Sequence, residues 1–184
     1  MKQVVLGFLC LFLAAPAFAD PAAFQFAAPN LRAPDNPNVG GMRLSFLHGK
    51  NVEMSGFDFG LISLSESKNR SGLAAIFGVS KTTGKSSGCN AGLIVTNTGQ
   101  STGLNAAFIN RVQTITSGAN LGFVNITEGF SAVDISGLGI SNRSNVQLGF
   151  LNVTQKIEKF QFGFLNIAEN GFLPVFPIVN FPKK

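Results

Sequence analysis

Tryptophan and tyrosine are absent from this 184-residue sequence, and histidine occurs once, as His48. A site that needs two histidines, such as a multi-histidine metal centre, therefore cannot be assembled from this chain. Cysteine occurs twice, but Cys10 lies in the N-terminal apolar run described below, which leaves Cys89 without a partner for an internal disulfide. Stability must then come from packing and backbone hydrogen bonds.

Charge is also scarce, because only 12% of the residues are Asp, Glu, Lys or Arg. The 14 Lys and Arg residues outnumber the 9 Asp and Glu residues, yet they form no basic cluster, so nucleic acid is not an expected partner. Glycine and phenylalanine are abundant instead, with 21 and 19 residues. Such a composition is typical of a chain that is deeply self-packed or faces lipid.

Residues 1–19 are typical of a secretory signal peptide. Lys2 precedes an apolar run over residues 4–13, and the small residues Ala17 and Ala19 stand just before Asp20. The run is too short to span a bilayer. We therefore expect export, cleavage after Ala19, and a mature protein in the periplasm, in the outer membrane or at the cell surface.

The remaining chain divides at Met42. Residues 20–41 carry four prolines among closely spaced Asn and Gly residues, which predicts a leader or linker with little regular structure. Residues 42–181 form a predicted β-repeat domain, and residues 182–184 form a short basic tail.

The β-repeat domain is periodic, and the clearest copies read VQLGFLNVT and FQFGFLNIA. We call the position of Gly149 and Gly163 in these copies the anchor position. Aligned on it, the domain contains ten units whose anchors are Ser45, Gly60, Ala75, Gly92, Ala107, Gly122, Ser136, Gly149, Gly163 and Pro177. A near-constant spacing of mostly 14 or 15 residues is typical of a repeat architecture.

Two further positions recur around the anchor. The residue two places before it is usually polar, and the residue three places after it is asparagine in five units, namely Asn110, Asn125, Asn152, Asn166 and Asn180. Apolar residues stand immediately before and after the anchor, as Phe162 and Phe164 do around Gly163, and every second residue is then apolar. This alternation predicts strands and an all-β fold. We expect Phe150 and Phe164 to lie in adjacent units and to be buried against one another.

Two arrangements of the strands are compatible with this pattern. In a β-solenoid each unit is one coil stacked in parallel on the last, so that Asn152, Asn166 and Asn180 would form a ladder of hydrogen-bonded amides. In an antiparallel meander closing into a small outer-membrane-type β-barrel, the natural repeat would be a hairpin of about twice this length. The absence of Trp and Tyr, which form the interfacial girdles of such barrels, favours the solenoid.

The last unit, GFLPVFPIVNF, contains Pro174 and Pro177 in an otherwise strand-like run. Proline removes a ladder hydrogen bond, which an end strand with one free edge tolerates and a barrel strand paired on both sides does not. These prolines also favour the solenoid, as a stack of about ten strand repeats of 14–15 residues, and they would stop a further strand from adding to its end.

The tandem G-[LF]-[LIV]-N units, the signal peptide and the GFLPVFPIVNF ending resemble a family of exported bacterial proteins described as surface-repeat-containing, for which no activity is established. The resemblance covers residues 42–181, is strongest from Ala119 onward, and departs where Gly78 and Val95 replace the asparagine. It implies an envelope protein of a Gram-negative or related bacterium and transfers no catalytic or binding residue.

Candidate chemistry is sparse. Asp58 and Asp134 share the position before the anchor, but they lie five units apart and cannot form a carboxylate pair in a solenoid; Arg43 is a candidate partner for Asp58. The segment around Lys85 lacks the spacing and the following helix of a phosphate-binding loop and is predicted to be a surface turn. We expect no catalytic residue, no cofactor and no metal.

The expected function is that of a noncatalytic exported repeat protein with a structural, adhesive or binding role at the bacterial envelope or cell surface. The alternative is a small outer-membrane β-barrel protein. The expected partner is an unidentified ligand or envelope component, and association with the outer membrane stays open.

Overall fold

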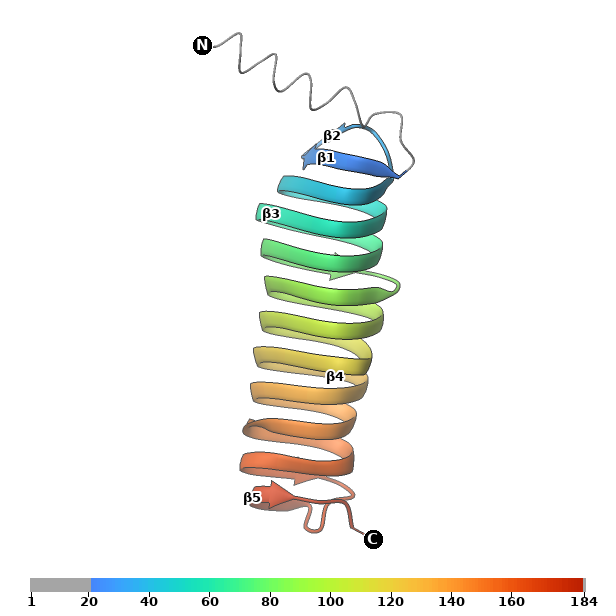
Figure 1. Ribbon diagram of the computed structural model, residues 1–184. Coiled ribbons are helices and arrows are strands. Elements are labelled where there is room, and N and C mark those ends of the chain that lie inside the picture. The colour runs from blue at the N-terminus through green and yellow to red at the C-terminus, as the bar shows by residue number, and fades with distance from the viewer. Residues whose placement is uncertain (1–20, 184) are drawn as a thin grey trace.

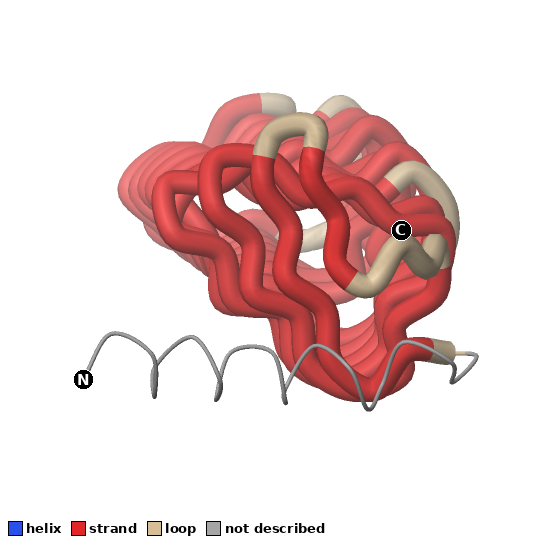
Figure 2. Tube along the Cα trace, turned by 90° about the horizontal axis from the view of Figure 1, so that it is seen from above, coloured by secondary structure: helices blue, strands red, loops and turns tan. Residues whose placement is uncertain are grey.

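The computed structural model describes residues 21–183. The chain winds as a β-solenoid, in which each coil of backbone stacks on the previous one along a single axis (Figure 1). Its strands are β1 (Ala22–Ala28), β2 (Leu31–Ala33), β3 (Asn38–Thr82), β4 (Ser86–Ala168) and β5 (Val175–Asn180). Strands β3 and β4 are long because they run through successive coils without interruption, and Figure 2 shows these coils superposed when viewed along the axis.

Neighbouring coils are parallel. The last coil of β3 pairs with the first coil of β4 in the register Arg70↔Ser86 and Ala75↔Ala91, so one coil takes 16 residues here. Side-chain hydrogen bonds join residues 15 apart further along, as at Asn90 and Asn105, and 14 apart near the end of β4. The parallel pairing confirms the predicted solenoid, and the antiparallel barrel alternative is wrong for this chain.

A column of glycines forms one bend of the longer coils. Its members are Gly56, Gly72, Gly88, Gly103 and Gly118, with φ between +98° and +113°. A Cβ atom on Gly103 would lie 2.1 Å from the carbonyl oxygen of Gly88, so a side chain fits neither the backbone conformation nor the space. Beyond Gly118 the coils shorten, and Ser141 bonds to Thr154 only 13 residues later.

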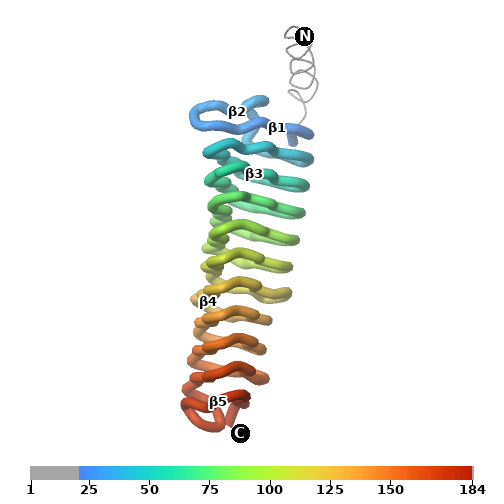
Figure 3. Tube along the Cα trace, turned by 90° about the vertical axis from the view of Figure 1, so that its left-hand side faces the viewer, coloured from blue at the N-terminus to red at the C-terminus, as the bar shows by residue number. Residues whose placement is uncertain are grey.

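Residues 20–41 were expected to be irregular, and the structure corrects this. Strand β1 is parallel to β3, with Phe26 opposite Leu44, and β2 folds back antiparallel on β1, with Phe26 opposite Ala33. The alternating sequence AAFQFAA suits a strand, and the prolines stand outside the paired segments, before β1, in the turn between β1 and β2 or after β2. This hairpin covers the N-terminal end of the stack (Figure 3).

The last unit does not continue the parallel stack. Strand β5 runs antiparallel to the end of β4, in the register Gln161↔Asn180 and Gly163↔Ile178. Asn180 therefore lies opposite Gln161 and not in line with Asn166, so the expected ladder from Asn166 to Asn180 is wrong. The prediction of an end strand is confirmed, because β5 is the outermost strand in the order β2-β1-β3-β4-β5.

The reversal has a local cause in the turn between β4 and β5. The amide of Ala168 donates to the carbonyl of Pro174 at 3.0 Å, which closes the turn before β5 begins. The side chain of Asn180 then donates to the carbonyl of Leu173 at 3.1 Å and accepts from the amide of Phe172 at the same distance. Pro177 stands where the register between β4 and β5 is irregular.

The interior of the solenoid is mainly polar. Among residues 21–183, buried Asn, Gln, Ser and Thr side chains outnumber buried apolar ones, and many Phe, Leu and Ile side chains are exposed. The described residues include no helix of the length and hydropathy needed to cross a membrane. The apolar residues on either side of the anchor therefore face outward. Phe150 and Phe164 were expected to face the interior.

Candidate functional site

Stacked amides line one column of the interior, at the position two places before the anchor. Asn90 donates through Nδ2 to Oδ1 of Asn105 at 3.2 Å, and Asn105 donates to Asn120 at 2.9 Å. Near the C-terminal end, Nε2 of Gln161 donates to Oε1 of Gln147 at 2.7 Å. Each amide thus bonds to its copy one coil away, which is the arrangement that parallel stacking of identical residues favours.

A second column contains the asparagines three places after the anchor. Asn110 donates to Oδ1 of Asn125 at 2.8 Å, and Asn152 donates to Oδ1 of Asn166 at 2.8 Å. The same Nδ2 of Asn152 also reaches the backbone carbonyl of Phe162 at 3.0 Å. Asn152 therefore ties its own coil to both the side chain and the backbone of the next coil, and Asn110 does the same through Asn125 and Leu121.

This column explains why glycine recurs at the anchor. A Cβ atom on Gly163 would lie 1.8 Å from the carbonyl oxygen of Gly149 and 2.6 Å from Nδ2 of Asn152. A Cβ atom on Gly122 would lie 2.5 Å from Oδ1 of Asn125. Glycine at the anchor and asparagine three places later therefore occur together in the units of Gly122, Gly149 and Gly163, because the amide occupies the space that a side chain at the anchor would fill.

A buried charge cluster lies in the first coils of β3. Nε of Arg43 donates to Oδ1 of Asp58 at 2.8 Å, and Nη2 of Arg70 lies 3.1 Å from Oδ2 of the same carboxylate. Ser65 donates to Asp58 at 2.7 Å and accepts from both arginines. The pairing with Arg43 is confirmed, whereas Arg70 was missed because it belongs to a polar segment between units that is typical of an exposed turn.

The cluster holds two guanidinium groups against one carboxylate, and all three side chains are almost fully buried. Burial tends to raise the pKa of Asp58, but the hydrogen bond and charge of Arg43, with the charge of Arg70, outweigh it and hold that pKa below its ordinary value. Burial lowers the pKa of Arg70 to about 10, although Asp58 opposes the shift. The ion pairs therefore depend on the single carboxylate.

Asp134 is buried in the amide column without a base. Its Oδ1 accepts from Nδ2 of Asn125 at 2.7 Å and from Ser136 at 2.9 Å, and its Oδ2 has no hydrogen-bond partner. Burial raises the pKa of Asp134 to about 6, because these two bonds compensate only part of the lost hydration. The folded protein therefore holds this proton more tightly than the unfolded chain does.

Replacing Asp134 by asparagine is expected to stabilise the protein at alkaline pH. The carboxyl ionises near 3.8 in the unfolded chain and near 6 in the folded one, so stability falls as pH rises through this window. A shift of about two pKa units corresponds to about 3 kcal/mol, the upper limit of the gain at pH 8. Urea unfolding of both proteins at pH 4 and pH 8 measures it; an equal gain at both pH values would contradict the assignment.

Apolar side chains cover one outer face of the solenoid. The rings of Phe108 and Phe123 stack with centroids 5.2 Å apart, and those of Phe150 and Phe164 stack at 4.9 Å with an interplanar angle of 2°. Adjacency of Phe150 and Phe164 is thus confirmed, but their burial is wrong, because they are 65% and 69% exposed. We call the column Phe77, Leu93, Phe108, Phe123, Phe150 and Phe164, with the flanking apolar residues, the apolar outer face.

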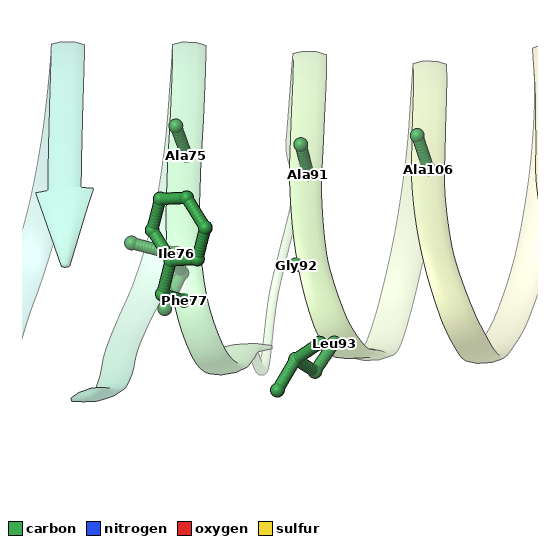
Figure 4. A pocket seen from close by; sticks show the side chains of 7 residues that line it. All are labelled: Ala75, Ile76, Phe77, Ala91, Gly92, Leu93 and Ala106. Atoms are coloured by element: carbon green, nitrogen blue, oxygen red, sulfur yellow. The ribbon is translucent and has the colours of Figure 1, made fainter. Parts of the chain in front are cut away.

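The apolar outer face contains a hollow of about 240 Å³. Ala75, Ala91 and Ala106 lie side by side on successive coils at its floor (Figure 4), and Phe77 and Leu93 border it. In later coils the equivalent position holds a larger residue, such as Leu121 or Phe162. The hollow is therefore open because the three alanine side chains are small.

The other candidate residues make few contacts. His48 is partly exposed, 3.8 Å from Glu66, and Cys89 is half-buried without a disulfide partner. The segment before β4 that contains Lys85 is a surface turn, as predicted. Within residues 21–183, no group of three His, Cys, Asp or Glu side chains is placed to hold a metal ion.

Comparisons with protein-family models, with curated proteins and with solved structures found no match for this chain. The resemblance to exported surface-repeat proteins therefore stays a prediction. The geometry of the solenoid and of its outer face carries the functional argument.

Proposed function

We propose that the protein is a noncatalytic, exported β-solenoid that works at the bacterial envelope or cell surface by presenting its apolar outer face to a binding partner. The observation that carries this proposal is the column of exposed apolar residues, mostly phenylalanines and interrupted at Gly137, on a solenoid with a mainly polar interior. Large exposed apolar patches on a folded chain are typical of sites that bind another protein or a membrane.

The scaffold keeps the apolar outer face in a fixed shape. The backbone of each coil is hydrogen-bonded to its neighbours, and the stacked amides tie the coils together from within. The aromatic rings are therefore held in register without being packed into a core. A surface that is ordered before binding loses little conformational entropy when a partner covers it.

The expected localisation outside the cytoplasm rests on residues 1–19, which lie outside the described residues. Expression of the whole sequence in a Gram-negative host, followed by mass spectrometry of the exported protein, is expected to find Asp20 at the N-terminus. An exported protein that retains residues 1–19 would contradict the predicted signal peptide and the localisation inferred from it.

The role of the apolar outer face is tested by chemical crosslinking of the exported protein in cells. The triple variant Phe123→Ser, Phe150→Ser and Phe164→Ser is expected to lose the crosslinked species that the wild-type protein forms with its partner. A matched control changes three exposed glutamines outside this face to serine, namely Gln100, Gln113 and Gln155. Thermal melts should show that both variants stay folded. If wild type and both variants give the same crosslinked species, the proposed role of the face is wrong.

A further inference from the structure

We propose that the partner of the apolar outer face is a second copy of this chain, packed antiparallel, so that Leu148 and Phe162 of its C-terminal coils enter the alanine hollow. The inference rests on the proposed function, because it names the partner of the same face. Three observations carry it: the area of the face, its repeat distance and the position of the hollow.

The area is sufficient for a stable dimer. Leu93, Phe108 and Phe123 are 60%, 59% and 60% exposed, and Phe77, Phe150, Phe162 and Phe164 are exposed to a similar degree. At roughly 200 Å² for each large side chain, these seven residues present about 800 Å². Stable protein interfaces bury about this area on each partner.

Two copies of the apolar outer face have the same repeat distance. Stacked rings in adjacent coils lie 4.9 Å and 5.2 Å apart, which is the spacing of neighbouring strands. Two copies of such a surface share one period, so the side-chain ridges of one can fit between those of the other along the whole face. A second copy necessarily has this period, because it has the same strand spacing.

The position of the hollow selects the antiparallel arrangement. In a two-fold pair with parallel axes each coil meets its own copy, so the hollow meets only the coils that already border it. An antiparallel pair whose two-fold axis passes through the coil of Phe123 instead places Ala91 opposite Leu148 of the second copy. It also brings Phe108 level with Gly137, the one residue of this column without a side chain. In such an isologous contact both copies fill each other's gaps.

The first experiment measures mass by sedimentation of the exported protein over a range of concentrations, without detergent. Wild type is expected to have twice the mass of one chain. Ala91→Phe fills the hollow at the surface and is expected to raise the Kd of the dimer by ~30-fold or more, as loss of a hot-spot contact does. Gln113→Phe adds the same ring outside the face and should leave the Kd unchanged.

The second experiment locates the two-fold axis. In a Cys89→Ser background, Phe123→Cys is expected to form a disulfide-linked dimer on mild oxidation, and Gln113→Cys in the same background is not. A wild-type monomer at all concentrations would overturn the proposal, and so would a dimer that responds equally to Ala91→Phe and Gln113→Phe. A monomer that sediments with phosphatidylglycerol vesicles would overturn the second copy as partner and leave the proposed binding role intact.

Discussion

Replacing Gly103 by alanine is expected to lower the free energy of unfolding by about 2–6 kcal/mol. The φ of Gly103 is +112°, a conformation that costs a residue with a side chain about 1–3 kcal/mol. The new Cβ atom would also lie 2.1 Å from the carbonyl oxygen of Gly88, and such overpacking costs about 1–3 kcal/mol more. The obstacle is backbone, so no side-chain rotation relieves it. Chemical denaturation monitored by far-UV circular dichroism measures the loss.

The matched control for Gly103 is Gly92→Ala. The nearest atom to a Cβ on Gly92 is the carbonyl oxygen of Ile76 at 3.1 Å, and Gly92 does not have the left-handed backbone of Gly103. Removing a glycine there also reduces the conformational freedom of the unfolded chain, which offsets a small clash. We expect a change below about 1 kcal/mol at Gly92. Equal losses at Gly92 and Gly103 would show that the glycine column is not the strained part of the coil.

Replacing Asp58 by asparagine is expected to destabilise the protein by about 3–5 kcal/mol at pH 7, because it leaves two buried guanidinium groups without a counter-charge. The loss should shrink in acid. The folded pKa of Asp58 is held below the ordinary 3.8, so its contribution is complete above about pH 4 and disappears as pH falls through the folded value. Urea unfolding of both proteins from pH 7 down to pH 3 follows this convergence.

The control for Asp58 is the same chemical change at Asp134, which lies in the interior without a base and is expected to respond with the opposite sign. If Asp58→Asn were neutral or stabilising at pH 7, the two arginines would have to be satisfied by something other than this carboxylate. If Asp→Asn lowers the free energy of unfolding at residue 58 and raises it at residue 134, the neighbouring side chains determine the effect, because the two positions are equivalent in the repeat.

The period of the sequence predicted the repeat architecture, and Pro174, Pro177 and the absence of Trp and Tyr then favoured the parallel stack. Because every coil of a solenoid meets the same surroundings, residues such as Gly149 and Gly163 must satisfy the same contacts, and the repeat records this. The period could not tell inside from outside. Alternation separates two faces of a strand, but either face can be interior when stacked amides satisfy their own hydrogen bonds.

The ends and the bends were harder to predict. The ending FPIVNF resembles FGFLNI closely enough to suggest another parallel coil, and only the hydrogen bonds of the turn around Pro174 reverse it. The glycine column looked like ordinary turn composition between units, because its stacking is visible only when Gly88 and Gly103 are placed one above the other. The role of Arg70 was hidden for the same reason.

The polar interior also sets how stability depends on temperature. The heat capacity of unfolding rises with the apolar surface that becomes exposed and falls with the polar surface. Here the phenylalanines of the outer face are already in water in the single chain, and unfolding exposes mainly amides and hydroxyls. The heat capacity change per residue should therefore lie below the usual ~12–15 cal/mol/K. A smaller value flattens the curve of free energy against temperature, so the coil stack loses little stability on cooling and declines slowly on warming.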